Sequence, residues 1–215
     1  HFAALAVGSE HGLAGPDAAA WAGRLEAAVA DLDVALQWAA GGDIDLGLRM
    51  SAALWRWWLT SGQLAAGRGW LGRFLARAAR RRDEESGRAF CSAAVLAAEN
   101  GDYPEAVRLA KIALGIFDAL GLPERSALAA TVLGSAFRYL GDRDAAGRCF
   151  QAALDLRAKL DDRRGLSVAM NNLALMALTQ AGDEVLCSAA IYGGTLHVLA
   201  DLLARFGLKT RFLSL

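Results

Sequence analysis

The sequence LGSAFRYLGDRDAAGRCFQAAL, residues 133–154, contains two apolar patterns of helical spacing with a Gly-Asp turn between them. Small and apolar residues recur at intervals of three and four on both sides of the turn, which is typical of helices buried along one face. Gly141 can adopt the left-handed conformation that ends a helix, and Asp142 can cap the start of the next one. The stretch therefore predicts a helical hairpin. The first pattern begins shortly before this stretch and consists of Leu128, Val132, Leu133, Ala136, Phe137 and Leu140; the second consists of Ala145, Ala146, Cys149, Phe150, Ala153 and Leu154.

The same turn recurs along the chain at a nearly constant spacing. Equivalent glycines stand at positions 62, 101, 141 and 182, so the steps are 39, 40 and 41 residues. A repeat of this length indicates stacked supersecondary units rather than one globular core. Because short loops force neighbouring helices to run antiparallel, we expect an all-α solenoid of helical hairpins over residues 1–181. The predicted helices span about 18–40, 44–60, 64–81, 86–99, 104–120, 124–139, 143–160 and 164–180.

Large and small residues alternate in the hairpin at offsets that resemble the tetratricopeptide repeat. The resemblance rests on Leu133-Gly134, Phe137, Gly141-Asp142, Ala146, Phe150 and Ala153. It implies a right-handed α-solenoid of tetratricopeptide-like hairpins. Small residues would let paired helices approach closely, and Leu or Phe would fill the space between them.

Tryptophan-containing segments in the first third of the chain resemble the helical region of large bacterial transcriptional regulators of the LuxR-like and antibiotic-regulator types. These segments are Trp21-Ala22-Gly23-Arg24-Leu25-Glu26, Ala53-Leu54-Trp55-Arg56-Trp57-Trp58 and Gly69-Trp70-Leu71. The resemblance covers about residues 1–180 and implies the sensor or scaffold arm of a signalling ATPase. It does not place the nucleotide site here, because the chain contains no G-x-x-x-x-G-K-[ST] motif.

The helical pattern stops after Gly182, and residues 182–215 predict a short βαβ-like appendage instead. Glu184-Val185 followed by Tyr192-Gly193-Gly194-Thr195 resembles the pyridoxal-phosphate enzymes of cysteine and methionine metabolism, the transsulfuration family. That resemblance implies a tyrosine, Tyr192, lying over the cofactor ring. The family's Schiff-base lysine and phosphate cradle have no counterpart in this sequence, so we expect no cofactor and a packed tyrosine.

Two origins for residues 182–215 stay open at this point. One is a chimeric join of two unrelated coding segments near residues 172–183, and the other is an evolved cap on the solenoid. The chain starts at His1 rather than at Met, and we therefore expect a recombinant piece or a partial reading frame.

Composition and charge exclude several classes of function. The 23 basic and 23 acidic residues cancel, so no global field attracts nucleic acid directly or an anionic membrane surface. No segment is typical of a membrane span or a secretory signal. Three cysteines and three histidines are too scattered for a disulfide framework or a metal site. The cysteines would stay reduced in the cytoplasm, which is the expected location.

Catalysis is not predicted, since no Ser–His–Asp or Cys–His set can be assembled and His1 and His11 fall in an expected frayed end. Two other clusters have a functional and a structural interpretation, and the structural one is favoured for both. Trp55, Trp57, Trp58 and Trp70 predict a stacked core rather than an aromatic ligand cage. Arg77 and Arg80 to Arg82 predict a solvated helix end rather than a phosphate site, because cations stabilise a helix C-terminus.

The predicted functional surface is the concave groove formed by the first helix of each hairpin. We expect a protein or peptide partner to bind there, through polar side chains that do not pack inward. The candidate residues are Arg56, Thr60, Arg88, Glu99, Thr131, Ser135, Arg138 and Asn171. The predicted function is a non-enzymatic protein-interaction or effector-sensing scaffold, with an inactive fragment of a pyridoxal-phosphate enzyme as the alternative.

Overall fold

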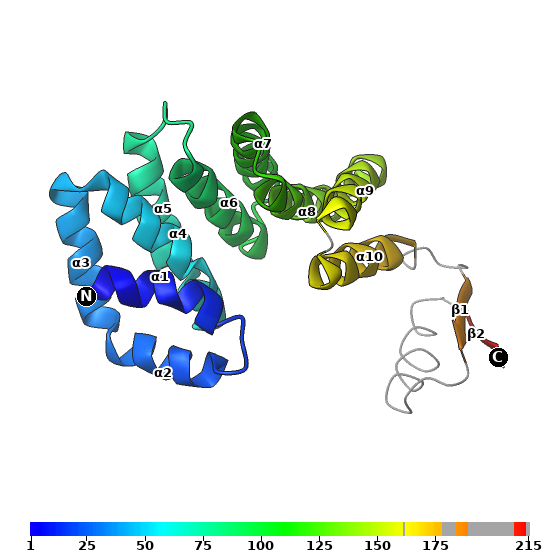
Figure 1. Cartoon of the computed structure of the whole chain (residues 1–215), viewed down its shortest axis with the longest axis horizontal. Helices are drawn as coiled ribbons and strands as arrows, with labels where there is room; N and C mark the ends of the chain where they lie inside the picture. Colours follow the sequence, from blue (N-terminus) through cyan, green and yellow to red (C-terminus); the bar gives the residue numbers. More distant parts are fainter. Residues whose placement is uncertain (161, 178–183, 189–208, 214–215) are drawn as a thin grey trace.

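The computed structural model describes residues 1–160, 162–177, 184–188 and 209–213. Ten helices in these ranges pack as sequential hairpins along an extended array (Figure 1). The helices are α1 (Phe2–Gly12), α2 (Ala18–Ala27), α3 (Val29–Gly42), α4 (Ile44–Thr60), α5 (Leu64–Arg77), α6 (Glu84–Glu99), α7 (Tyr103–Leu120), α8 (Pro123–Leu140), α9 (Arg143–Lys159) and α10 (Arg163–Ala177).

The turns follow the chemistry that the sequence predicts. Gly62, Gly101 and Gly141 have φ angles of 74°, 80° and 83°, in the left-handed region that favours glycine. The side chain of Asp142 accepts a hydrogen bond from the amide of Ala145 at 3.0 Å and so caps α9. The fourth repeat glycine, Gly182, lies outside the described residues.

The helices form two layers. The first helices of successive hairpins, α4, α6 and α8, pack side by side, and the second helices, α5, α7 and α9, each pack against their own hairpin partner. We call the layer formed by α4, α6 and α8 the inner layer and the other one the outer layer. Helix α10 packs against α9 and α8 and so continues the inner layer.

Within each hairpin a phenylalanine of the second helix lies against a glycine of the first. The pairs are Gly47 with Phe74, Gly87 with Phe117, and Gly134 with Phe150. A Cβ atom at Gly134 would come within 2.7 Å of the Phe150 ring, and one at Gly87 within 2.6 Å of the Phe117 ring. All three rings are buried, at 0%, 1% and 0% exposed for Phe74, Phe117 and Phe150. The absence of a side chain on the inner helix therefore sets how closely the two helices approach.

The N-terminal part differs from the prediction in two ways. The sequence predicts one helix over about 18–40, whereas the chain bends at Ala28, with φ −106° and ψ 7°, into two helices, α2 and α3. Residues 2–12, expected to be frayed, form α1, which packs on α4 (Figure 1). The helix is held by tertiary packing: Ala6 and Ser9 are fully buried, and Phe2 and Leu5 are partly buried against the core.

The C-terminal segment contains two short strands, β1 (Glu184–Ser188) and β2 (Lys209–Leu213). They pair in parallel, with Glu184 opposite Lys209 and Ser188 opposite Leu213. The helix predicted between them and Tyr192 lie outside the described residues, as do residues 178–183 of the proposed join. The complete βαβ appendage therefore stays a prediction.

Candidate binding groove

A cavity of about 140 Å³ opens on the inner layer, between α4, α6 and α8. Its wall is mostly apolar and includes Trp55, Val95, Leu128 and Val132. We call it the inner cavity. Its lining residues are Glu10, Trp55, Arg88, Cys91, Ser92, Val95, Phe117, Arg125, Leu128 and Val132.

Two arginines and three carboxylates surround the end of the inner cavity at which α1 terminates. Arg88 of α6 pairs with Glu85, at 3.1 Å, and with Glu10 of α1. Arg125 of α8 contacts Glu10 at 3.7 Å and Glu84 at 3.5 Å. The side chain of Arg88 is only 12% exposed, which strengthens its ion pairs relative to surface pairs. The network joins three helices that are far apart in sequence.

The hydroxyl and thiol groups in this cavity are not poised for nucleophilic chemistry. Burial raises the pKa of the Cys91 thiol to about 12, although the charge of Arg125 lowers it in part. The thiol is therefore protonated at neutral pH, and only the thiolate is a good nucleophile. Ser92 donates its hydroxyl proton to the carbonyl oxygen of Ala52 at 2.9 Å and so links α6 to α4. The described residues contain no group of three His, Cys, Asp or Glu side chains that could hold a metal ion.

Of the eight candidate groove residues, Arg88 lines the inner cavity. Two others on α4 interact with their own helix. Thr60 donates to the carbonyl oxygen of Arg56 at 2.9 Å, and the Arg56 guanidinium lies 4.5 Å from the centre of the Trp55 ring.

The remaining candidates lie elsewhere on α6, α8 and α10. Thr131 donates to the Ala127 carbonyl at 2.8 Å, within its own helix. Arg138 lies 4.3 Å from the centre of the Tyr139 ring. Ser135 is half-buried on α8, while Glu99 and Asn171 are exposed near the end of α6 and on α10. The structure thus brings one of the eight residues into the cavity and distributes the others along the array.

Sequence reasoning missed the residues that complete the cavity. Arg125, Leu128 and Val132 have the i, i+3 and i+7 spacing of one helical face, so this signal was present in the predicted helix 124–139. Glu10 gave no signal, because its contacts with α6 and α8 depend on where α1 packs.

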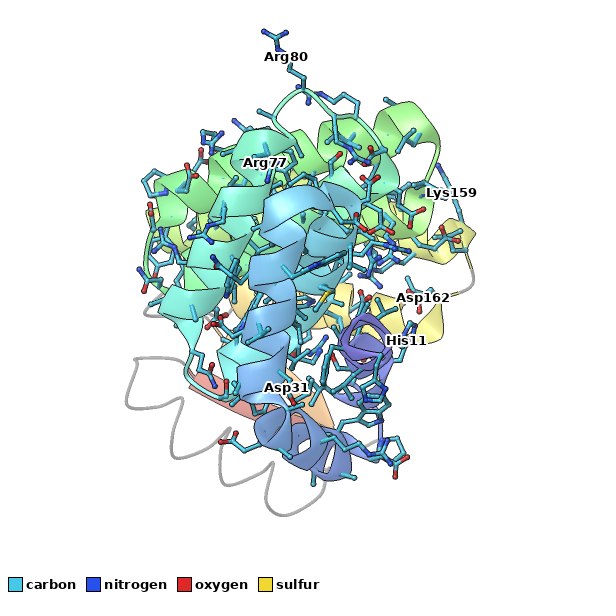
Figure 2. The ribbon with its side chains drawn as sticks, turned by 90° about the vertical axis from the view of Figure 1, so that its left-hand side faces the viewer. His11, Asp31, Arg77, Arg80, Lys159 and Asp162 are labelled. Atoms are coloured by element: carbon cyan, nitrogen blue, oxygen red, sulfur yellow. The ribbon has the colours of Figure 1, made fainter. Side chains whose placement is uncertain are left out.

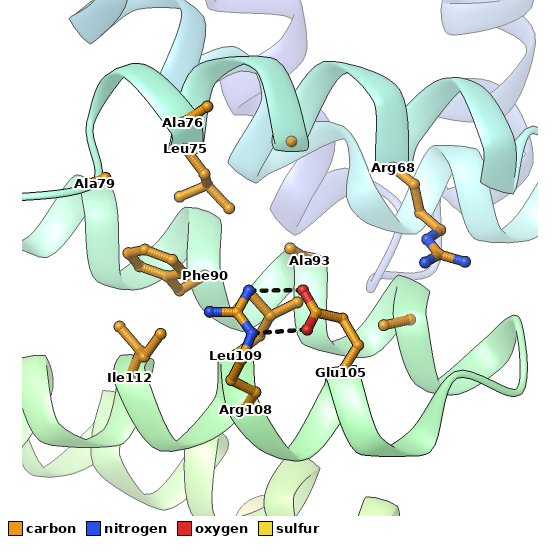
Figure 3. Close-up of a pocket in the computed structure, with 12 residues that line it drawn as sticks. Arg68, Leu75, Ala76, Ala79, Phe90, Ala93, Glu105, Arg108, Leu109 and Ile112 are labelled. Carbon is orange, nitrogen blue, oxygen red and sulfur yellow. Dashed lines mark hydrogen bonds and ion pairs between the residues drawn. The ribbon is translucent and has the colours of Figure 1, made fainter.

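A second cavity, of about 490 Å³, lies between α5 and α7 over the surface of α6 (Figure 3). Leu75, Phe90 and Ile112 form an apolar side, and an ion pair lies on the α7 wall. Arg108 donates two hydrogen bonds of 2.7 Å to the carboxylate of Glu105. These bonds lower the pKa of Glu105 and raise that of Arg108, so both groups stay charged at neutral pH. We call this space the outer cavity.

The four tryptophans predicted to stack, Trp55, Trp57, Trp58 and Trp70, lie in the hairpin of α4 and α5, and most of them contribute to its packing. Trp57 and Trp58 are buried in the core, and Trp55 lines the inner cavity. The indole nitrogen of Trp70 donates to Asp33 at 3.0 Å, and its ring stacks on that of Phe74 with centres 6.0 Å apart. These contacts account for Trp57, Trp58 and Trp70 without a ligand.

The arginines after α5 connect that helix to its neighbours. Arg81 pairs with Asp83 at 2.6 Å and also with Asp45 at the start of α4. Arg77 donates to the carbonyl oxygen of Ala40 at the end of α3. Arg80 extends from the loop between α5 and α6 toward solvent (Figure 2). Most of this cluster therefore has partners within the chain.

None of the helices that the structure describes combines the length and the apolar character that a membrane-crossing helix needs.

Comparison with known proteins shows the fold. BtubC from P. vanneervenii, a tetratricopeptide and kinesin-light-chain-like protein, matches with a TM-score of 0.58 at 19% identity. The match covers 72% of this chain and 65% of BtubC, so this chain spans less than two thirds of that protein. The helical part therefore has a tetratricopeptide-like repeat fold.

A short likeness of a different kind was also found. Forty residues of the chain are 48% identical to sulfhydrylase FUB7 from Fusarium oxysporum f. sp. lycopersici, which is 19% of this chain and 9% of that protein. No protein-family model matches the chain.

Proposed function

We propose that the helical array is a protein-binding scaffold whose inner cavity accepts a peptide or helix carrying an apolar anchor beside an acidic residue. The observation that supports it is the inner cavity itself, which places an apolar wall next to two arginines on adjacent hairpins. A groove of this composition suits partner recognition better than chemistry, because its thiol is protonated and its serine hydroxyl is bonded to the backbone.

The two halves of the cavity would have different roles. Leu128 and Val132 would contribute affinity by removing apolar surface of the partner from water. Arg88 and Arg125 would orient the partner, since guanidinium groups form directional hydrogen bonds with carboxylates. An acidic residue close to an apolar anchor is the pattern we expect in a ligand.

Peptides selected on the full chain from a randomised display library test this function. We expect the Leu128→Glu variant to bind the selected peptides at least about tenfold more weakly than the parent, because the new carboxylate enters an apolar wall. Leu120→Glu is the matched control, because Leu120 on α7 is 43% exposed, Leu128 is 38% exposed, and only Leu128 lines the inner cavity. Equal effects of the two variants, or no effect of Leu128→Glu, would place the binding surface elsewhere.

The proposal also includes the larger protein in which such a scaffold would work. The resemblance of about residues 1–180 to the helical region of large bacterial regulators supports a role as the scaffold arm of a cytoplasmic signalling ATPase. In that setting, binding of a partner or effector to the inner layer would stabilise the hairpins that it contacts. Because each repeat stabilises its neighbours, the effect would extend along the array toward the ATPase.

For residues 182–215 we propose a separate origin, as a piece of a pyridoxal-phosphate enzyme of sulfur amino-acid metabolism that is inactive in this chain. Two observations support it: the short likeness to a sulfhydrylase and the parallel pairing of β1 with β2, which departs from the helical repeat. On this proposal the scaffold function lies entirely in the helical array.

Deleting residues 184–215 tests this separation. We expect the remaining chain to keep its helical circular dichroism per residue and a melting midpoint within a few degrees of the parent, since the hydrophobic core lies in α1–α9. Loss of cooperative melting would show instead that the segment is an evolved cap that covers the last repeat.

A further inference from the structure

Helix α1 ends beside the inner cavity, and its position suggests what the cavity binds. The helix packs along α4, and Glu10 near its C-terminal end contacts arginines of both α6 and α8. We propose that α1 covers a surface of this chain to which an acidic helix of a partner protein binds, and that the partner helix displaces α1 from it. The inference rests on the proposed scaffold function and names the class of partner.

The packing of α1 makes displacement feasible. Its fully buried side chains are small, Ala6 and Ser9; Phe2 and Leu5 are only partly buried against the core, and Val7 is 40% exposed. Apolar burial stabilises in proportion to area, so such a helix is held weakly compared with one anchored by buried leucines. Ser9 also satisfies its own hydroxyl by donating to the Ala6 carbonyl at 2.6 Å, so it makes no polar bond that displacement would break.

The ion pairs of Arg88 and Arg125 also favour displacement of α1. When Glu10 leaves, Arg88 keeps Glu85 at 3.1 Å and Arg125 keeps Glu84 at 3.5 Å. The arginines would therefore not be left as buried, unpaired charges, which would be costly. Arg88 and Arg125 thus have three carboxylate partners between them, and an acidic side chain of the partner can take the place of Glu10.

The shape of α1 defines the partner. Helix α1 carries a carboxylate at Glu10. Its buried side chains are Ser9, one residue earlier, and Ala6, four residues earlier. Small side chains at those positions allow the close approach to α4. We therefore expect a partner helix of the pattern small-x-x-small-Glu, or the same pattern with Asp. While α1 is bound it competes from within the chain, at an effective concentration of roughly millimolar.

The test uses the full chain and a fluorescent peptide with the sequence FAALAVGSEHGL, residues 2–13. In the Glu10→Gln variant the chain's own α1 loses its charged contact and competes less well. We expect this variant to bind the peptide about tenfold or more tightly than the parent. Glu26→Gln, on an exposed position of α2, is the matched control and should bind like the parent.

Two further measurements make the result specific. A peptide with Gln in place of its Glu should bind the Glu10→Gln variant about tenfold more weakly than the acidic peptide. Amide hydrogen exchange in α1 of the parent should accelerate when the acidic peptide is added and should be unchanged in α4, which remains packed.

The outcomes separate this inference from the function on which it rests. If the acidic peptide fails to bind Glu10→Gln while library-selected peptides still bind and depend on Leu128, the inference is overturned and the scaffold function stands. If neither kind of peptide binds, both fail. Equal affinity of the acidic and amide peptides would overturn the role of the arginines.

Discussion

Replacing Phe150 by alanine is expected to lower the free energy of unfolding by about 3–5 kcal/mol. Phe150 is 0% exposed, and its ring lies against the backbone of Gly134 on α8. Because Gly134 has no side chain, nothing adjacent can move into the space that the ring leaves. The cost therefore includes the cavity as well as the lost transfer free energy.

Urea unfolding followed by circular dichroism would measure this loss, and hydrogen exchange would locate it. Stability in a repeat array passes between neighbouring units, so we expect protection to fall first in α8, α9 and α10. Tyr139→Ala is the control, because this aromatic side chain is 54% exposed and loses far less on truncation. A loss below about 1 kcal/mol at Phe150 would be incompatible with the packing of α8 on α9.

The second large effect concerns alanine substitution of two helical glycines, which we expect to change the free energy of unfolding in opposite directions. Gly87→Ala is expected to destabilise by about 1–3 kcal/mol, because the new Cβ would lie within 2.6 Å of the buried Phe117 ring. Gly115→Ala, in the interior of α7, is expected to stabilise by about 0.5–1 kcal/mol, because no atom lies within 4 Å of its Cβ position.

Both variants replace the same residue in the same kind of element, so helix propensity predicts the same gain for each. Chemical denaturation of the two variants beside the parent gives the comparison. Two gains would show that α6 and α7 are farther apart than the structure has them. A double variant, Gly87→Ala with Phe117→Leu, should recover part of the loss, since a smaller side chain leaves room for the methyl group.

These glycines illustrate what sequence patterns can reveal. Gly62, Gly101 and Gly141 were identifiable because each ends an apolar helical run at a regular spacing, and the structure confirms their left-handed conformation. Gly47 and Gly87 lie within helices, and no local pattern distinguishes them from exposed Gly115. Their role appears only when a phenylalanine about thirty residues later packs on them.

The boundaries of the repeat helices were predicted well, and the N-terminal region was not. Helices predicted at 44–60, 104–120 and 124–139 correspond closely to α4, α7 and α8, because turn glycines and first-turn prolines mark their ends. Helix α1 lacks such marks, and its fully buried residues, Ala6 and Ser9, are small. Its stability comes from α4, which a local pattern cannot contain.

The groove could be predicted only in part. Arg88 follows from the repeat register, and it does line the inner cavity. The position of Glu10 beside Arg88, 78 residues away in sequence, follows from the docking of α1 on the inner layer. Ion pairs between distant elements carry no periodicity, so composition and spacing cannot reveal them.

The sequence alone determined that this protein is an array of helical hairpins, because helical periodicity and turn chemistry depend on residues close together in the chain. Only the tertiary structure decided which glycines hold the layers together, where the inner cavity lies and which helix ends beside it. Those features depend on contacts between residues far apart in the chain, whose distances are set by the packing of whole helices.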